Sequence, residues 1–166
     1  MTANSLSFTL HPLQADQRQQ ATDWIRRRWG SEIMVTHGQV YRPGELPGFV
    51  AVGGDQWLGL LTYHSAGEAC EIVTLDTDHP NQGIGTALIA AARRAALQAG
   101  CRRLWLITTN DNTAALRFYQ RRGFALAALH RDAVSRSRQI KPEIPMIGND
   151  GIPIRDELEL EMALSD

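Results

Sequence analysis

Alternating apolar and polar residues predict strands along most of the chain. Residues 49–54, 57–64 and 70–77 form three such runs, separated by short turns. Because short turns join antiparallel neighbours, these runs predict an antiparallel meander. The same pattern predicts four further strands, at residues 6–13, 102–109, 124–130 and 157–164. In the last strand, leucines and a methionine alternate with glutamates, so we expect one buried face and one face that carries the glutamates.

Apolar residues at helical spacing predict the helices. The most regular stripe predicts a helix over residues 85–99, which ends at Gly100. Another helix is predicted from Asp16, as its N-cap, to about Trp29, with Gly30 as its end. Shorter helical segments are predicted at residues 110–123 and 133–139. Two stretches with several prolines and glycines predict irregular structure, at residues 31–48 and 141–156.

Composition and charge narrow the class of protein. A chain of 166 residues with 43% hydrophobic content suits one α/β domain over residues 1–166. Seventeen basic residues against 18 acidic ones argue against a nucleic-acid binder. Cys70 and Cys101 lack metal-site or disulfide spacing, so both are expected to be small buried residues. Neither a leader peptide nor a long apolar run is evident, which predicts a cytoplasmic protein with no membrane partner.

A glycine-containing loop precedes the 85–99 helix, in the stretch HPNQGIGTALI at residues 79–89. A phosphate-binding P-loop needs a lysine before its Ser or Thr, and Thr86 has none. A dinucleotide fingerprint needs a third glycine where the chain has Leu88. The first-turn amides of the helix could still bind a pyrophosphate without any basic residue. The alternative is an ordinary turn between a strand and a helix.

Two motifs together resemble the GNAT superfamily of N-acetyltransferases. The first is EIVTLDTDHPNQGIGTALIAAARRAA, in which Gly83 and Gly85 stand at the glycines of the family motif. The second is NDNTAALRFYQRRGF, which supplies the family's residues at Asn112, Ala115, Tyr119, Gly123 and Phe124. The chain departs from the pattern at Pro80, where relatives usually have Gln or Arg, and Gln82 is out of register with that position.

The resemblance implies a mixed, mostly antiparallel central sheet, flanked by helices, with a splayed parallel pair at residues 70–77 and 102–109. It implies acetyl-coenzyme A as donor co-substrate and no metal, with homodimers common among relatives. The pantetheine would pair with the backbone near Leu75 and Thr77. The pyrophosphate would bind the amides of Gln82, Gly83, Ile84, Gly85, Thr86 and Ala87. The face of the second helix that would look at the cofactor carries Asn112, Ala115 and Tyr119.

Three side chains are candidates for catalysis. Tyr119 matches the tyrosine that relatives use as general acid, although it would also suit plain packing. Glu71 lies within an apolar strand, where desolvation raises a carboxyl pKa toward that of a base, although a strand edge in solvent would also tolerate it. His64 is an alternative base. If residues 65–68 form the hairpin loop, His64 pairs with Ala69 and shares a sheet face with Glu71.

The leading hypothesis is an enzyme that moves an acetyl group to a primary amine, directly in a ternary complex. The acceptor is expected to be a small molecule or a peptide, held by residues 29–48 and 141–156. Asp150, Asp156 and Glu157 could attract its charge, or could be solvated turn residues. One alternative is a non-catalytic acyl-coenzyme A sensor or interaction module, which Pro80 motivates. Another alternative is a nucleotide-phosphate binder of a different fold.

Overall fold

The computed structural model describes residues 6–165. Its strands are β1 (Thr9–Pro12), β2 (Met34–Thr36), β3 (Gln39–Tyr41), β4 (Gly48–Gly53), β5 (Gln56–Ala66), β6 (Ala69–Thr77), β7 (Arg103–Thr109), β8 (Ala125–His130) and β9 (Glu157–Ala163). Its α-helices are α1 (Arg18–Trp29), α2 (Ile84–Gln98), α3 (Thr113–Gln120) and α4 (Ala133–Ile140). Short 3-10 turns are η1 (Ala15–Gln17), η2 (Pro43–Glu45) and η3 (Asn149–Gly151).

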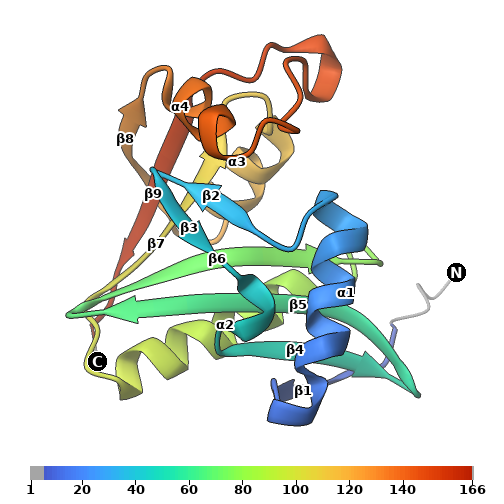
Figure 1. Ribbon diagram of the computed structural model, residues 1–166. Helices are drawn as coiled ribbons and strands as arrows, with labels where there is room; N and C mark the ends of the chain where they lie inside the picture. The colour runs from blue at the N-terminus through green and yellow to red at the C-terminus, as the bar shows by residue number, and fades with distance from the viewer. Residues whose placement is uncertain (1–5, 166) are drawn as a thin grey trace, which may run out of the picture.

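Seven strands form one mixed sheet in the order β1-β4-β5-β6-β7-β9-β8. Every neighbouring pair is antiparallel except β6 and β7, which are parallel. This confirms the predicted α/β fold with a mostly antiparallel sheet and one parallel pair. Helices cover both faces of the sheet, with α1 in front of it and α2 behind it in Figure 1.

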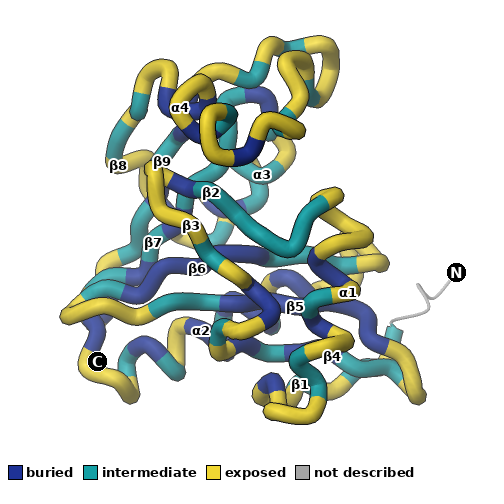
Figure 2. The backbone as a smooth tube through the Cα atoms, in the orientation of Figure 1, coloured by how far each residue is buried: buried dark blue, intermediate teal, exposed yellow. Residues whose placement is uncertain are grey.

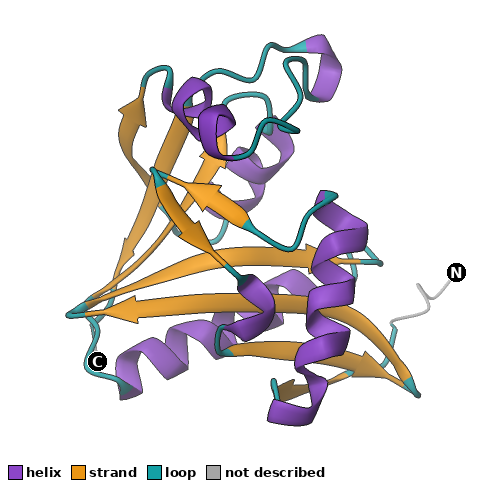
Figure 3. Cartoon of the chain, viewed as in Figure 1, coloured by secondary structure: helices purple, strands orange, loops and turns teal. Residues whose placement is uncertain are grey.

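The parallel pair separates along its length, which opens the middle of the sheet. β6 and β7 pair only from Ala69↔Arg103 to Ile72↔Leu106. Beyond that point β6 continues to Thr77 beside β5, while β7 continues to Thr109 beside β9. Figure 3 shows the two strands leaving a common end and diverging. The outer backbone edge of β6 after Ile72 is therefore not paired with β7.

Each face of the sheet has its own apolar cluster. α2 packs on one face against Leu61, Ile72 and Leu104, and both cysteines are free and buried on this side. α1 packs on the other face, where Trp24 and Ile25 meet residues of β4 and β5, among them Val50 and Leu60. Figure 2 shows the buried chain running along β4, β5, β6 and α2, whereas β8 at the sheet edge is largely exposed. In the described part of the chain, no helix is long and apolar enough to cross a membrane.

The start of the chain differs from the sequence prediction in two places. The first strand is shorter than residues 6–13, and its N-terminal neighbours are not paired with β4. Asp16 does not cap α1, because it lies inside η1, where the Gln14 amide donates to the Gln17 carboxamide at 3.0 Å. α1 therefore begins at Arg18, one residue later than an N-cap at Asp16 would place it.

The stretch 31–48, for which the sequence predicted no regular element, forms the β2–β3 hairpin and η2. The hairpin turns at His37 and Gly38, both with positive φ, and its strands have three residues each. It crosses in front of β6 and β7 (Figure 1). Strands this short carry too few residues for an alternating pattern to be recognised.

Candidate functional site

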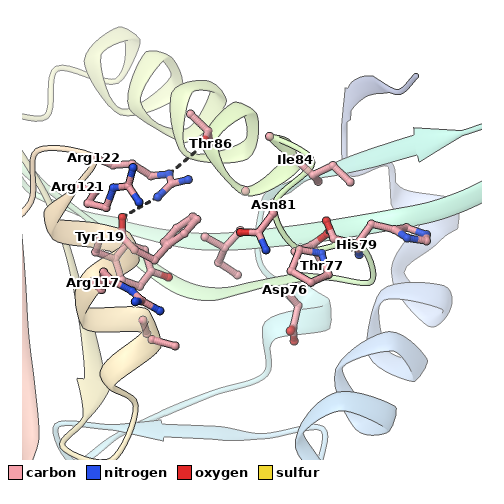
Figure 4. Close-up of a pocket in the computed structure, with 17 residues that line it drawn as sticks. Asp76, Thr77, His79, Asn81, Ile84, Thr86, Arg117, Tyr119, Arg121 and Arg122 are labelled. Carbon is pink, nitrogen blue, oxygen red and sulfur yellow. Dashed lines mark hydrogen bonds between the residues drawn. The ribbon is translucent and has the colours of Figure 1, made fainter. Parts of the chain in front are cut away.

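A cavity of about 880 Å³ opens where β6 and β7 separate. The end of β6, the loop after it, the start of α2 and one side of α3 line this cavity (Figure 4). Eight of the predicted cofactor-binding residues lie along it: Leu75, Thr77, Gly83, Ile84, Gly85, Thr86, Ala115 and Tyr119. Sequence reasoning therefore brought together residues from three elements that the fold places around one space.

The loop before α2 and the first residues of this helix line the cavity. Asn81 and Gly83 both have positive φ, of 64° and 79°, a conformation that asparagine and glycine adopt most readily. Among residues 6–165, no protein group accepts from the amides of residues 84–86 at the start of α2. These unpaired donors lie at the positive end of the helix dipole. The site is thus suited to a phosphate anion.

The predicted donor range 82–87 is too long at its C-terminal end. The Ala87 amide already donates to the Gly83 carbonyl at 3.0 Å, so it belongs to the helix and is not free for an anion. Gln82 does not line the main cavity. It lines a smaller hollow, where its side-chain oxygen accepts a hydrogen bond from the Leu6 amide at 3.4 Å. Asn112, which was expected to face the cofactor, does not line the cavity and caps α3 by accepting from the Ala115 amide at 3.1 Å.

Gly85 is required for a reason that the sequence did not reveal. A Cβ at this position would lie 2.9 Å from the Phe118 ring, which is closer than real Cβ contacts. The missing side chain therefore lets α3 pack against the start of α2. A Cβ at Gly83 would meet nothing within 4 Å, so that position needs its glycine for its positive φ alone.

Three arginines of the α3 region, Arg117, Arg121 and Arg122, line the cavity beside the start of α2. The Arg122 guanidinium stacks on Phe118 at 3.5 Å from the ring centre and donates to Thr86 Oγ1 at 2.8 Å (Figure 4). Burial, with the neighbouring Arg121, lowers the pKa of Arg122. The sequence interpretation allowed a pyrophosphate to bind without basic residues, and it missed this cluster. The sequence did carry a signal for them, because the three arginines stand close together at the end of the predicted 110–123 helix.

Tyr119 reaches the cavity from α3 out of an aromatic cluster. It is 9% exposed, and its ring makes edge-on contacts with Phe118 and Phe124 at 5.1 and 5.5 Å between centres. Burial raises the pKa of its phenol far above the usual value, and the nearby Asp76 carboxylate raises it further. The hydroxyl therefore keeps its proton at neutral pH and can donate it.

Asp76 is a carboxylate at the cavity that the sequence analysis did not single out. It lines the cavity from β6, and its Oδ2 is buried without a hydrogen-bond partner among the residues described. Burial raises its pKa, while Arg28 and the Trp29 indole at the end of α1 lower it in part. A charged residue within the apolar run 70–77 was the signal that could have found it.

Glu71 and His64 lie next to each other but outside the lining of this cavity. Glu71 is 3% exposed, and its oxygens accept from the hydroxyls of Thr36 and Tyr41 at 3.0 and 2.7 Å. Burial raises the pKa of Glu71, and these two donors and His64 lower it in part. Glu71 thereby fastens the β2–β3 hairpin to the sheet. The predicted solvent-facing alternative for this residue is wrong.

The register that the sequence suggested for the β5–β6 hairpin is also wrong. His64 lies opposite Glu71 rather than Ala69, because the connecting turn is only two residues long. Directly opposed residues point to one face, so the expectation that His64 and Glu71 share a face is correct. The His64 ring also lies 5.4 Å from that of Tyr41.

Two of the three acidic residues expected to attract the acceptor, Asp156 and Glu157, are engaged elsewhere, and none of the three lines the cavity. Asp156 accepts from Arg155 at 2.9 Å and from the Asp132 amide at 2.9 Å. Glu157 is 2% exposed and accepts from the His37 amide and Ser137, so the glutamate face of β9 is partly buried. Residues 141–156 are mostly irregular, as predicted, but do not line the cavity.

Comparison with known proteins identifies the family. A family model described as "Acetyltransferase (GNAT) family" matches residues 5–124. The chain belongs to this GNAT family of acetyltransferases. It is similar to protein YdhI of Bacillus subtilis (strain 168), with 44% identity over 138 residues that cover 82% of this chain and 86% of YdhI.

Two further GNAT comparisons bear on the ligand. Streptothricin acetyltransferase of Streptomyces lavendulae is 36% identical over 86 residues, which cover 52% of this chain and 42% of that protein. The crystal structure of a GNAT family acetyltransferase from Elizabethkingia anophelis, with acetyl-coenzyme A bound, has a TM-score of 0.67. It is 21% identical and covers 98% of this chain and 100% of that one. Acetyl-coenzyme A is the donor that GNAT enzymes use.

Proposed function

We propose that this GNAT protein moves an acetyl group from acetyl-coenzyme A to a primary amine, directly in a ternary complex. The observation that carries the proposal is the cavity at the separated strands. It brings free helix amides, an unpaired strand edge and the Tyr119 phenol together around one space. A thioester held there would have an anion site at one end and a proton donor near its sulfur.

The donor would bind by its backbone and its phosphates. Its pantetheine would pair with the open edge of β6 near Leu75 and Thr77, as an added strand would. Its pyrophosphate would lie against the amides of residues 83–86, beside the arginines of α3. The open edge, the unpaired amides and the positive charge support these assignments.

Tyr119 would act as the general acid of the transfer. The neutral amine attacks the thioester carbonyl carbon, a C–N bond forms and the C–S bond breaks. Tyr119 donates its proton to the departing sulfur, and the second proton of the amine nitrogen returns to the phenolate through water. The position of Tyr119 on the cavity wall and its protonated phenol support this role.

Glu71, with His64, is proposed as the route by which an amine that arrives as an ammonium ion loses its first proton. Neither residue lines the cavity, so the proton would reach them through water. The raised pKa of Glu71 and its position directly opposite His64 on the same face of the sheet support the pair. A structural function for Glu71 alone would leave turnover unchanged when its charge is removed.

The acceptor would be a small molecule or a peptide with a primary amine. Similarity to a streptothricin acetyltransferase supports an amine on a small molecule. The competing proposal, a coenzyme A-binding protein without turnover, is favoured by Pro80, which lines the cavity but has no amide to donate.

The test is thiol release from acetyl-coenzyme A in the presence of a panel of amines. We expect turnover with the wild type, and Tyr119→Phe to lower kcat by about 10²–10⁴-fold with donor affinity unchanged. Glu71→Gln is expected to lower kcat less. The neighbouring Phe118→Tyr, which adds a hydroxyl outside the proposed position, is the matched comparison. Tight donor binding without thiol release for any amine would support the non-catalytic alternative. Full activity of Tyr119→Phe and of Glu71→Gln would refute the roles assigned to these two residues.

A further inference from the structure

We propose that Asp76 is the carboxylate that binds the ammonium group of the acceptor, which restricts acceptors to amines that arrive as cations. This inference deepens the proposed function and depends on it for the identity of the reaction. Asp76 is not among the residues singled out in the two family motifs. The proposal follows from its position in β6, which a β-bulge in that strand determines.

A β-bulge at Val73 sets the direction of Asp76. Tyr63 opposes Ile72 and Thr62 opposes Thr74, so Val73 is an extra residue in β6 without a partner in β5. In a regular strand, residues 71 and 76 would point to opposite faces because they are an odd number apart. The bulge shifts the alternation by one residue and brings both carboxylates to one face.

That face is the one covered by α1 and the β2–β3 hairpin. Asp76 lies opposite Leu60, which packs against α1, and Thr62 and Thr74 share a hydrogen bond of 2.7 Å along the same row. Ile84 and the start of α2 belong to the other face, and Figure 4 shows Asp76 pointing away from them. The cavity reaches both sides because β6 and β7 have separated there.

The electrostatic state of Asp76 calls for a cation. Its Oδ2 is buried without a hydrogen-bond partner among the residues described, and the nearby Arg28 and Trp29 indole offset only part of the cost of burial. A buried carboxylate oxygen without a donor is costly, and the cost is removed by a ligand that supplies N–H groups. Arg28, the nearest cation of α1, already forms a salt bridge with Asp78. Tyr119 faces Asp76 from α3 and is uncharged at neutral pH.

The position also suits the first step of the reaction. An alkylammonium that donates to Asp76 has its nitrogen at the acceptor side of the opening, while the thioester lies on the α2 side. Asp76 holds the ammonium there, and the proton that the ammonium must lose passes through water toward the Glu71–His64 pair, which leaves a neutral amine to attack the carbonyl carbon. Tyr119, on the far side of that carbon, then serves the leaving sulfur. The two groups act on different atoms, and each keeps the protonation state that its task needs.

The experiment measures amine binding separately from turnover. Protein saturated with coenzyme A is titrated by NMR with primary alkylamines, from methylamine to hexylamine, and with the matching alcohols. We expect the wild type to bind amines and not alcohols. Asp76→Asn should bind the same amines at least about tenfold more weakly, the loss expected when one charge-assisted hydrogen bond is removed. Thiol release with the best amine should show the same change in KM.

Asp55→Asn is the matched control, because it removes the same charge from an exposed turn between β4 and β5. Equal amine affinity in Asp76→Asn and in the wild type would overturn the proposal, as would equal binding of amines and alcohols. Failure of the proposed function has a different signature: amines bind and depend on Asp76, but no thiol is released. Turnover with an unchanged KM in Asp76→Asn would instead leave the function standing and remove Asp76 from it.

Discussion

Glu71, which is buried, and Asp76, which is half-buried, are two carboxylates on one face of β6 with different surroundings. Glu71 accepts hydrogen bonds from two hydroxyl groups, and both donors come from the β2–β3 hairpin. Asp76 has one oxygen with no donor in the described structure. Glu71 thus holds the hairpin against the sheet, whereas Asp76 lines the cavity with an oxygen that can accept from a ligand. Unsatisfied polar groups of this kind cost stability, and proteins retain them where a ligand uses them.

This cost predicts how stability depends on pH. Burial raises the pKa of Asp76 in the folded protein, so the folded state binds its proton over a range where the unfolded state has lost it. The stabilisation is present below the unfolded pKa and is lost as pH rises through the folded pKa. Asp76→Asn, which never ionises, should therefore unfold at a higher temperature than the wild type at about pH 8.

The gain should be smaller at about pH 3, below the ordinary pKa of an aspartate, where the wild-type carboxyl is also protonated. Each kcal/mol corresponds to a rise of about 2–4 °C for a chain of this size. Glu71, whose pKa is shifted in the same direction, is present in both proteins and cancels from the difference. Calorimetric unfolding of both proteins across this range measures the effect. A difference in unfolding temperature that does not grow with pH would show that the Asp76 charge carries no folding cost.

At the scale of elements, one short segment fixes the long irregular loop. The three residues before α3 read Asn-Asp-Asn, and each has its own task. Asn110 accepts from the amides of residues 155 and 156, and Asn112 caps α3. Asp111, 3% exposed, accepts from the backbone and the side chain of Asn149, both at 3.0 Å. The loop 141–156 is therefore tied to β7 and α3 by side chains of the second family motif.

Asp111→Ala should destabilise the protein by about 2–3 kcal/mol, because it removes a buried charged acceptor and leaves donors unpaired. Chemical denaturation measures the loss, and hydrogen exchange should become faster at the Asn149 amide in particular. Glu143→Ala, which removes an exposed carboxylate from the same loop, is the control and should change stability little. A loss in Asp111→Ala without faster exchange at Asn149 would mean that the loop is held by other contacts.

The elements that the sequence predicted correctly share a strong periodic signal. Residues 85–99 and 70–77 repeat their pattern over several turns or pleats, and α2 and β6 match them to within about a residue. The β2–β3 hairpin has no such repeat, so it was missed. The bulge at Val73 was missed as well, since a single extra residue leaves no trace in an apolar run such as Glu71 to Leu75. The faces of Asp76 and Glu71 depend on that residue, so the sequence alone could not place both carboxylates on one face.

At the scale of the whole molecule, the separated strands join two otherwise unconnected faces. The α2 face has free amides and the arginines of α3, so it presents positive charge. The α1 face has Asp76, so it presents negative charge to the same cavity. An anionic donor and a cationic acceptor would thus enter from opposite sides and meet at the opening. Complementary charge of this kind directs each ligand to its own side.

This arrangement predicts which ligand stabilises the fold. Acetyl-coenzyme A at about one hundred times its Kd should add about 2.7 kcal/mol to the free energy of unfolding, which corresponds to a rise of about 5–10 °C. ATP and NAD should stabilise less, because they offer phosphates to the amides of residues 83–86 but no pantetheine to the open edge of β6. Thermal unfolding with each ligand at equal concentration measures the order. Arg122→Ala should reduce the shift for all three ligands, whereas Arg93→Ala, on the exposed side of α2, should not. A larger shift with ATP or NAD than with acetyl-coenzyme A would mean that the strand opening does not receive pantetheine, and the proposed reaction would lose its donor.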